Sequence, residues 1–242
     1  MENINNPQVT PAMAISSDAD KGLSIRGLFE VFYKPAQFFE NLKNHPKILI
    51  PYIAILILTM VTMYLMMDAM VTMQIESPQL QERLQGQQLP ENARNFMRIS
   101  TFVAGVIFSM LIPPVAALLA VFFGNFIMAG KARYKQVLSV MLYGQFLFDA
   151  GGILTALFIY MKGQMMAPFS LGFLAIDKGF QSLPFVALSK IDLFNIWEII
   201  VVGIGLAAVY GFVRNKGYWL SVLSVGMLSV LHVLLTAIGS LF

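Results

Sequence analysis

Residues 192–219 read DLFNIWEIIVVGIGLAAVYGFVRNKGYW, and this stretch decides the class of fold. A short polar start leads into about sixteen apolar or small residues, as in a membrane-spanning helix. The basic residues Arg214 and Lys216 close the run and a second apolar run follows at once, which is typical of a span with a cationic end. We therefore predict a membrane helix here, and we expect the rest of the chain to pack around it.

The composition supports the same class. The 242 residues are 57% hydrophobic and 12% charged, whereas soluble domains carry about a quarter charged residues. A mean hydropathy of +0.71 predicts a polytopic membrane protein with the lipid bilayer as its surroundings. The net charge of +3 is too small to indicate a nucleic-acid partner, and the absence of cysteine excludes disulfides.

We predict an all-α membrane protein with five transmembrane helices. A disordered cytoplasmic tail is expected over 1–22, and one membrane domain over 23–242. A glutamine-rich loop is expected to face water at 74–99, and the proline-broken segment 162–191 to dip into the outer interface. The five spans are predicted at about 51–67, 101–128, 137–161, 195–213 and 219–242.

The cations predict the orientation of these spans. Assigning the tail and the second and fourth connections to one side places ten of the sixteen Lys and Arg residues there. The positive-inside rule then predicts a cytoplasmic amino terminus and an outside carboxyl terminus. An odd number of spans fits this arrangement.

An amphipathic segment precedes the first span. Its apolar residues recur at helical spacing, with lysines nearby, so it suits a helix in the lipid headgroup region. Packing beneath the bundle is the second interpretation, and both can hold together. Tryptophans at two span ends are further candidates for the membrane interface. The candidate interfacial residues are Phe29, Phe32, Phe38, Phe39, Trp197 and Trp219.

Two stripes of small residues recur every fourth position, so each lies along one helix face and favours close approach of another helix. The stripes are Gly203, Ala207 and Gly211, and Ala116, Ala120 and Gly124. The second span also contains Pro113 and Pro114, and prolines inside a helix are a cause of bending. They free carbonyls near residues 109 and 110, for which Ser109 is the candidate partner. A kinked packing helix is the preferred interpretation and a gating hinge the other.

Polar residues inside the spans form the candidate functional site. Gln145 and Asp149 are four apart and share one helix face, and Asp192, Asn195 and Glu198 are spaced by three at the outer end of the fourth span. Intramembrane carboxylates are functional candidates, so this polar strip is a candidate to share an ion or substrate site with Asp149. A buried hydrogen-bonded cluster is the preferred interpretation, because Glu198 is close to the helix end.

Motifs of catalysis and cofactor binding are missing from the sequence. There is no HExxH, G-x-S-x-G or Walker A pattern, and His232 and His45 belong to opposite ends of the predicted bundle. Residues 203–208 formally match G-x-G-x-x-A, but no strand precedes them. We therefore expect no enzyme, no cofactor and no metal site, with His232 a packed, hydrogen-bonded side chain.

Two short motifs carry a family resemblance. Residues 34–43 (KPAQFFENLK) resemble the amino-terminal KPxxxFExL region of the Ypt-interacting-protein (Yip) domain family, and residues 191–197 (IDLFNIW) with the 203–208 run resemble its bacterial branch. The resemblance implies a five-helix membrane domain without a known active site, over about 25–240. Eukaryotic members are linked to small GTPases and vesicle traffic. Their DLYGP segment is replaced here by His45-Pro46-Lys47, so GTPase binding is not carried over.

Two functional hypotheses follow. The first is a non-enzymatic scaffold or membrane-organising protein, placed in a bacterial inner membrane and contacting a membrane-protein partner or a second copy of itself. Its contacts would come from residues 24–44 and from the small-residue stripes. The alternative is a carrier or channel for an ion, lipid or small solute, lined by Gln145, Asp149 and Glu198.

Overall fold

The computed structural model describes residues 25–239, so the tail predicted over 1–22 lies outside the described residues. Within them the chain is helical and has no strand beyond an isolated bridge between Ser170 and Asp192. The α-helices are α1 (Arg26–Tyr33), α2 (Pro35–Leu42), α3 (Leu49–Ile75), α4 (Pro78–Leu84), α5 (Glu91–Val121), α6 (Tyr134–Lys162), α7 (Leu183–Ser189), α8 (Leu193–Tyr210), α9 (Arg214–Ser221) and α10 (Met227–Gly239). Two π-helical segments, η2 (Phe122–Ile127) and η4 (Val222–Gly226), and the 3₁₀ segment η3 (Leu171–Lys178) complete the order.

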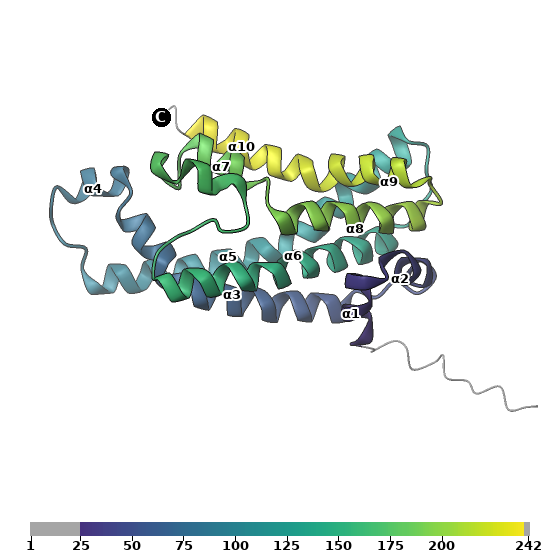
Figure 1. Cartoon of the computed structure of the whole chain (residues 1–242), viewed down its shortest axis with the longest axis horizontal. Helices are drawn as coiled ribbons and strands as arrows, with labels where there is room; N and C mark the ends of the chain where they lie inside the picture. The colour runs from purple at the N-terminus through teal and green to yellow at the C-terminus, as the bar shows by residue number, and fades with distance from the viewer. Residues whose placement is uncertain (1–24, 240–242) are drawn as a thin grey trace, which may run out of the picture.

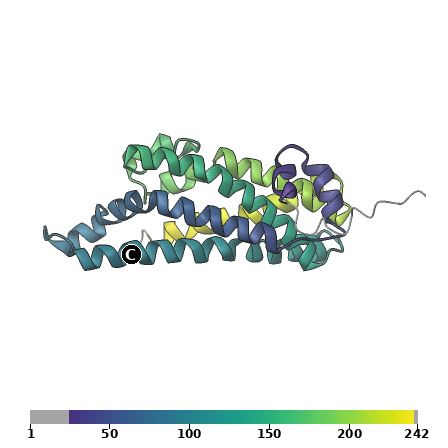
Figure 2. The same ribbon diagram turned by 90° about the horizontal axis from the view of Figure 1, so that it is seen from below.

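Five of the described helical segments are long and apolar enough to cross a membrane, which confirms the predicted fold class. They run side by side and alternate in direction (Figure 1). Helices α1 and α2 lie at one end of this bundle, and α4 lies at the opposite end (Figure 2). The five segments are Leu49–Ile75, Glu91–Ile127, Tyr134–Lys162, Leu193–Tyr210 and Arg214–Ile238.

The first two long helices extend beyond the predicted spans. Helix α3 continues to Ile75 and α5 starts at Glu91, so only the short α4 and its turns separate them. An ion pair between Asp68 and Arg98 and a hydrogen bond from Gln74 to Thr101 join the two extensions. Polar pairs of this kind explain why the water-facing segment expected at 74–99 is mostly helical.

The centre of the bundle is α6, and not the helix over 193–210 around which the sequence was expected to organise the chain. Its apolar window is 61% buried, against 44% for α8 and 11% for the last span. Glycines at 144 and 151 admit Val202 and Phe194 of α8 against its backbone. Helix α6 contacts α3, α5 and α8, so most of its surface faces protein and not lipid. Its mean hydropathy is the lowest of the five spans.

Helices α8 and α9 form a hairpin that packs closely at glycine residues. Gly211 has a φ of +67°, which glycine adopts without strain, and it ends α8 at Tyr210. Gly211 therefore terminates the helix and does not pack against a neighbour, contrary to its predicted place in the stripe. Across the hairpin, the backbone of Gly217 lies against the Gly203 carbonyl and Ala207. The fourth helix accordingly stops three residues before its predicted end at 213.

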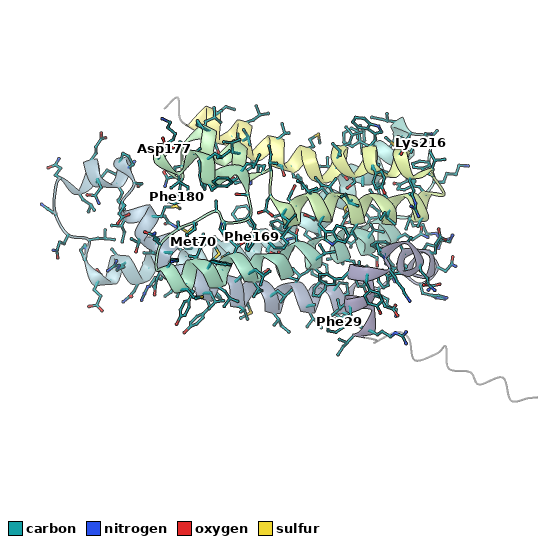
Figure 3. All side chains as sticks on the ribbon, in the orientation of Figure 1. Phe29, Met70, Phe169, Asp177, Phe180 and Lys216 are labelled. Carbon is teal, nitrogen blue, oxygen red and sulfur yellow. The ribbon has the colours of Figure 1, made fainter. Side chains whose placement is uncertain are left out.

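The segment 163–192 folds into a small cap at the end opposite to α1. Backbone hydrogen bonds join Leu171 to Ile191 and Leu193 to Phe169, at 3.0 Å each. The Phe169 ring packs edge-on between Phe158 of α6 and Phe194 of α8, and Figure 3 shows it inside the bundle while Asp177 lies on the outer edge of the cap. The cap is thus a folded unit held on two spans, with α7 also contacting α10.

Candidate functional site

A polar cluster in the apolar interior joins three helices. The Gln145 amide of α6 donates to Asp149 Oδ1 at 2.8 Å, and the Thr59 hydroxyl of α3 donates to Asp149 Oδ2 at 3.4 Å. Thr59 Oγ1 also lies 2.8 Å from Ser109 Oγ of α5. The predicted pair Gln145 and Asp149 is therefore in contact, and Thr59 links it to α5.

Glu198 of α8 adds a residue from a fourth helix to this cluster. Its residue exposure is 6%, and it interacts electrostatically with Asp149. Its side chain lies next to Gly144 of α6, since a Cβ atom there would be in ordinary van der Waals contact with Glu198 Oε1, at 3.7 Å. Within residues 25–239 no hydrogen bond to the Glu198 carboxyl is found. Two carboxyl groups without a cation can share a proton or hold a small cation, and this is the chemistry the cluster offers.

Asp192 and Asn195 do not belong to the cluster. Asp192 is the N-cap of α8, and its carboxylate accepts from the backbone N–H of Phe194 at 2.8 Å and of Asn195 at 3.3 Å. Burial raises the pKa of Asp192, although these two hydrogen bonds oppose the rise. The polar strip predicted from the spacing of three is thus divided. Asp192 caps α8, and Glu198 is the member of the strip that is buried in the bundle.

Replacing Asp192 by asparagine should remove one pH dependence of stability while keeping the cap. The raised pKa means that the folded protein still binds this proton at pH values just above the ordinary 3.8, where the unfolded chain has released it. Stability from this group is therefore complete below pH 3.8 and is lost as pH rises through the raised pKa. Asparagine caps as well as aspartate. Thermal unfolding in detergent at stepped pH should show the wild-type fall and its absence in Asp192→Asn.

The control is Asp177→Asn, since Asp177 is an exposed carboxylate of the same cap. It changes the charge of the same cap without touching the start of α8, so the fall assigned to Asp192 should remain. Equal profiles for wild type and Asp192→Asn would contradict the assignment of this titration to the helix cap.

Helix α5 passes through Pro113 and Pro114 without a break, so the candidate hinge is a continuous helix in this structure. Proline at 114 has no N–H for the Met110 carbonyl. The Tyr52 hydroxyl of α3 donates to that carbonyl at 3.2 Å. Ser109, the partner expected from the sequence, bonds Thr59 instead. The sequence did not indicate Tyr52 as the partner of this carbonyl, and the only signal for it was the position of Tyr52 in the first turn of a neighbouring span.

The second stripe of small residues is filled within the chain. Ala116, Ala120 and Gly124 are buried, and the Tyr210 hydroxyl of α8 donates to the Ala120 carbonyl at 3.1 Å. The Tyr210 ring lies over the Gly124 position. The second stripe therefore serves internal packing, as do Gly203 and Ala207 of the first, whereas Gly211 ends α8.

The amphipathic segment is divided between two surroundings. Phe38 and Phe39 of α2 are buried, with Phe38 4.6 Å from the Tyr143 ring and Phe39 beside Gly205 of α8. Phe29 of α1 is 63% exposed, and Figure 3 shows it at the edge of the bundle. Packing beneath the bundle thus describes α2, whereas the outer face of α1 is open.

The remaining candidates lie apart from the cluster. Trp197 is exposed near the start of α8, and Trp219 is exposed in the last turn of α9, near the start of the fifth span at the other end of the bundle. His232 is exposed on α10, with its Nδ1 3.4 Å from Lys190 Nζ, so it is not the packed residue that we expected. In the described part of the chain, no three His, Asp or Glu residues gather as a metal site would require.

These elements define a polytopic helical membrane protein with a polar cluster sealed among its spans. The Yip1 domain family matches residues 29–237, which is most of the chain, and the chain belongs to this family. The Yip1 domain is a membrane-associated domain of the trafficking type, and the family is non-catalytic. No curated protein and no solved structure matches the chain significantly.

Proposed function

We propose that this protein is a non-enzymatic scaffold of a bacterial inner membrane, whose α1 face binds a partner membrane protein on the cytoplasmic side. The observation that supports this most is the exposed aromatic face of α1, held on the bundle by the buried face of α2. Membership of a non-catalytic trafficking-type family is consistent with a binding role.

The charge distribution supports a cytoplasmic location for α1. Among the described residues, the bundle end with α1 and α2 has nine Lys and Arg residues and two acidic ones. The opposite end has six cationic and six acidic residues. By the positive-inside rule, the first end faces the cytoplasm and α10 ends outside.

The α1 face has the properties of a protein contact. Phe29 and Tyr33 are both more than 60% exposed, one turn apart on the same side of the helix. Aromatic residues are enriched at protein interfaces, and Tyr is among the residue types enriched at binding hot spots. All members of the two small-residue stripes except Gly211 pack inside the chain, so we place the partner contact on the α1 face and not on the stripes. The proposed partner is a membrane protein, and a second copy of this chain is one such partner.

In-cell photocrosslinking from position 29 should give a discrete protein adduct. The matched control is position 96, because Phe96 is 71% exposed but lies on α5 near the other end of the bundle. The second arm uses protein without the photocrosslinker and measures how much of the same partner is recovered with it. Phe29→Asp with Tyr33→Asp should lower this recovery about 30-fold, as expected for a hot spot of about 2 kcal/mol. Phe96→Asp should leave recovery unchanged.

Equal crosslinking from positions 29 and 96 would contradict the proposal, as would adducts to lipid alone. Deleting 1–44 is a less specific test, because it also removes Phe39, which is fully buried against α8.

The alternative is a carrier or channel that uses the polar cluster. The observation in its favour is that Asp149 and Glu198, which are 49 positions apart in sequence, interact inside the bundle. Against it, Asp149 is already hydrogen-bonded on both oxygens and the proline helix is continuous. We therefore assign the cluster a structural role in the proposed scaffold.

A further inference from the structure

A cavity of about 460 Å³ lies at the α1 end of the bundle, outside the polar cluster and outside the α1 face. It is lined by residues 44–48 of the connection between α2 and α3, by residues 49 and 50 at the start of α3, and by Lys135 in the first turn of α6. Two basic residues, Lys47 and Lys135, thus line one cavity from segments that are distant in sequence. His45 and Asn44 add further polar groups.

The frame of this cavity is fixed by hydrogen bonds to α6. The Gln136 amide donates to the Lys43 carbonyl at 2.7 Å, and the Ser139 hydroxyl donates to the Lys47 carbonyl at 2.6 Å. The Lys47 N–H returns a bond to Ser139 Oγ at 3.1 Å. Because Ser139 is fully buried, the connection cannot move away from α6 without breaking buried bonds. A ligand would therefore meet a preformed site.

The charge of the cavity favours an anion. No carboxylate lines it, and in the described chain neither Lys47 nor Lys135 forms an ion pair, whereas the nearby Lys43 is paired with Glu40. Helix α3 starts at Leu49 without a side-chain cap, so N–H groups of its first turn add to the positive potential. Lysines with backbone N–H groups are a usual setting for phosphate.

The position of the cavity favours a phosphate that belongs to a lipid. It opens where the first membrane-spanning helix begins, and the ends of such helices lie next to the lipid headgroups. Below it, Leu49, Ile53 and Ile57 are exposed along one face of α3 and offer an apolar surface for an acyl chain. A free phosphate would use the lysines alone and leave this surface unused.

We propose that this cavity binds the phosphate of an anionic phospholipid, with Lys47 and Lys135 on the headgroup and the start of α3 along the chain. The site is independent of the α1 contact, because the residues that line it belong to neither α1 nor the partner face. It adds a lipid ligand to the protein partner proposed above.

The test measures phosphatidylglycerol bound to the full-length protein in detergent by native mass spectrometry, with phosphatidylcholine as the neutral lipid. Changing Lys47 and Lys135 to Gln should lower phosphatidylglycerol affinity about 25-fold, at roughly fivefold for each lysine. Changing both to Arg should restore most of it. The matched control is Lys131→Gln with Lys216→Gln, which removes the same charge at the same end of the bundle without touching the cavity.

Loss of affinity in the Lys47 and Lys135 variant alone supports the site, as does a fall of wild-type affinity with salt. Equal losses in the control variant would overturn it, since only general surface charge would then be at work. Phosphatidylcholine bound as tightly as phosphatidylglycerol would also overturn it. Displacement of the lipid by inorganic phosphate at equal concentration would show a free-anion site and refute the lipid assignment.

Discussion

Gly217→Ala should destabilise the folded protein by about 3 kcal/mol or more, because the added methyl group meets main-chain atoms that cannot turn aside. A Cβ atom at this position would press on the Gly203 carbonyl and lie 2.7 Å from Ala207 Cβ. Relief requires α8 and α9 to separate. The melting temperature should fall by roughly 6–12 °C at this size of chain. Thermal unfolding in one detergent, followed by circular dichroism, measures the change.

The matched control is Gly152→Ala in α6. Its Cβ would meet no atom within 4 Å, so the same substitution should be neutral, or stabilising by up to about 1 kcal/mol through helix propensity. Equal melting temperatures for the two variants would show that the α8–α9 contact is not tight, and would refute this account of the hairpin.

Asp149→Leu should destabilise the protein by about 2 kcal/mol, because the Gln145 amide then has no acceptor in an apolar interior. Asp149→Asn should cost much less, since its amide oxygen still accepts a hydrogen bond. Adding Gln145→Leu to Asp149→Leu should recover most of the loss, as it removes the unpaired donor. Chemical or thermal unfolding of wild type, Asp149→Leu, Gln145→Leu and the double variant measures this cycle, with Asp149→Asn as the conservative control.

The same variants separate the structural role from transport. Cation flux in proteoliposomes that is present in wild type and abolished by Asp149→Asn and Glu198→Gln, with stability unchanged, would contradict the structural assignment. An additive cycle, in which Gln145→Leu recovers nothing, would contradict the hydrogen-bond account itself.

Much of the site was visible in the sequence, and the missing part has a common cause. Gln145 and Asp149 share a helix face by spacing alone, so their contact was predictable. Thr59 and Tyr52 were missed because a hydroxyl in an apolar run has no sequence signal until the facing helix is known. Asp192 and Glu198, six positions apart in a strip with a spacing of three, look equivalent in the sequence, but Asp192 caps the start of α8 and Glu198 faces α6.

The sequence by itself determined the class of protein. Five apolar runs of helical length must cross a bilayer as helices, because a helix satisfies its backbone hydrogen bonds within one segment, whereas an open strand in lipid leaves them unpaired. It also determined the family, through short motifs in a fixed order, and the side with more cations. Only the tertiary structure decided that α6 is central, that Gly211 ends a helix, and that Lys47 and Lys135 line one cavity. These features depend on which helix faces which, and the packing of whole side chains sets that choice, whereas the hydropathy of a span does not name the helix that it faces.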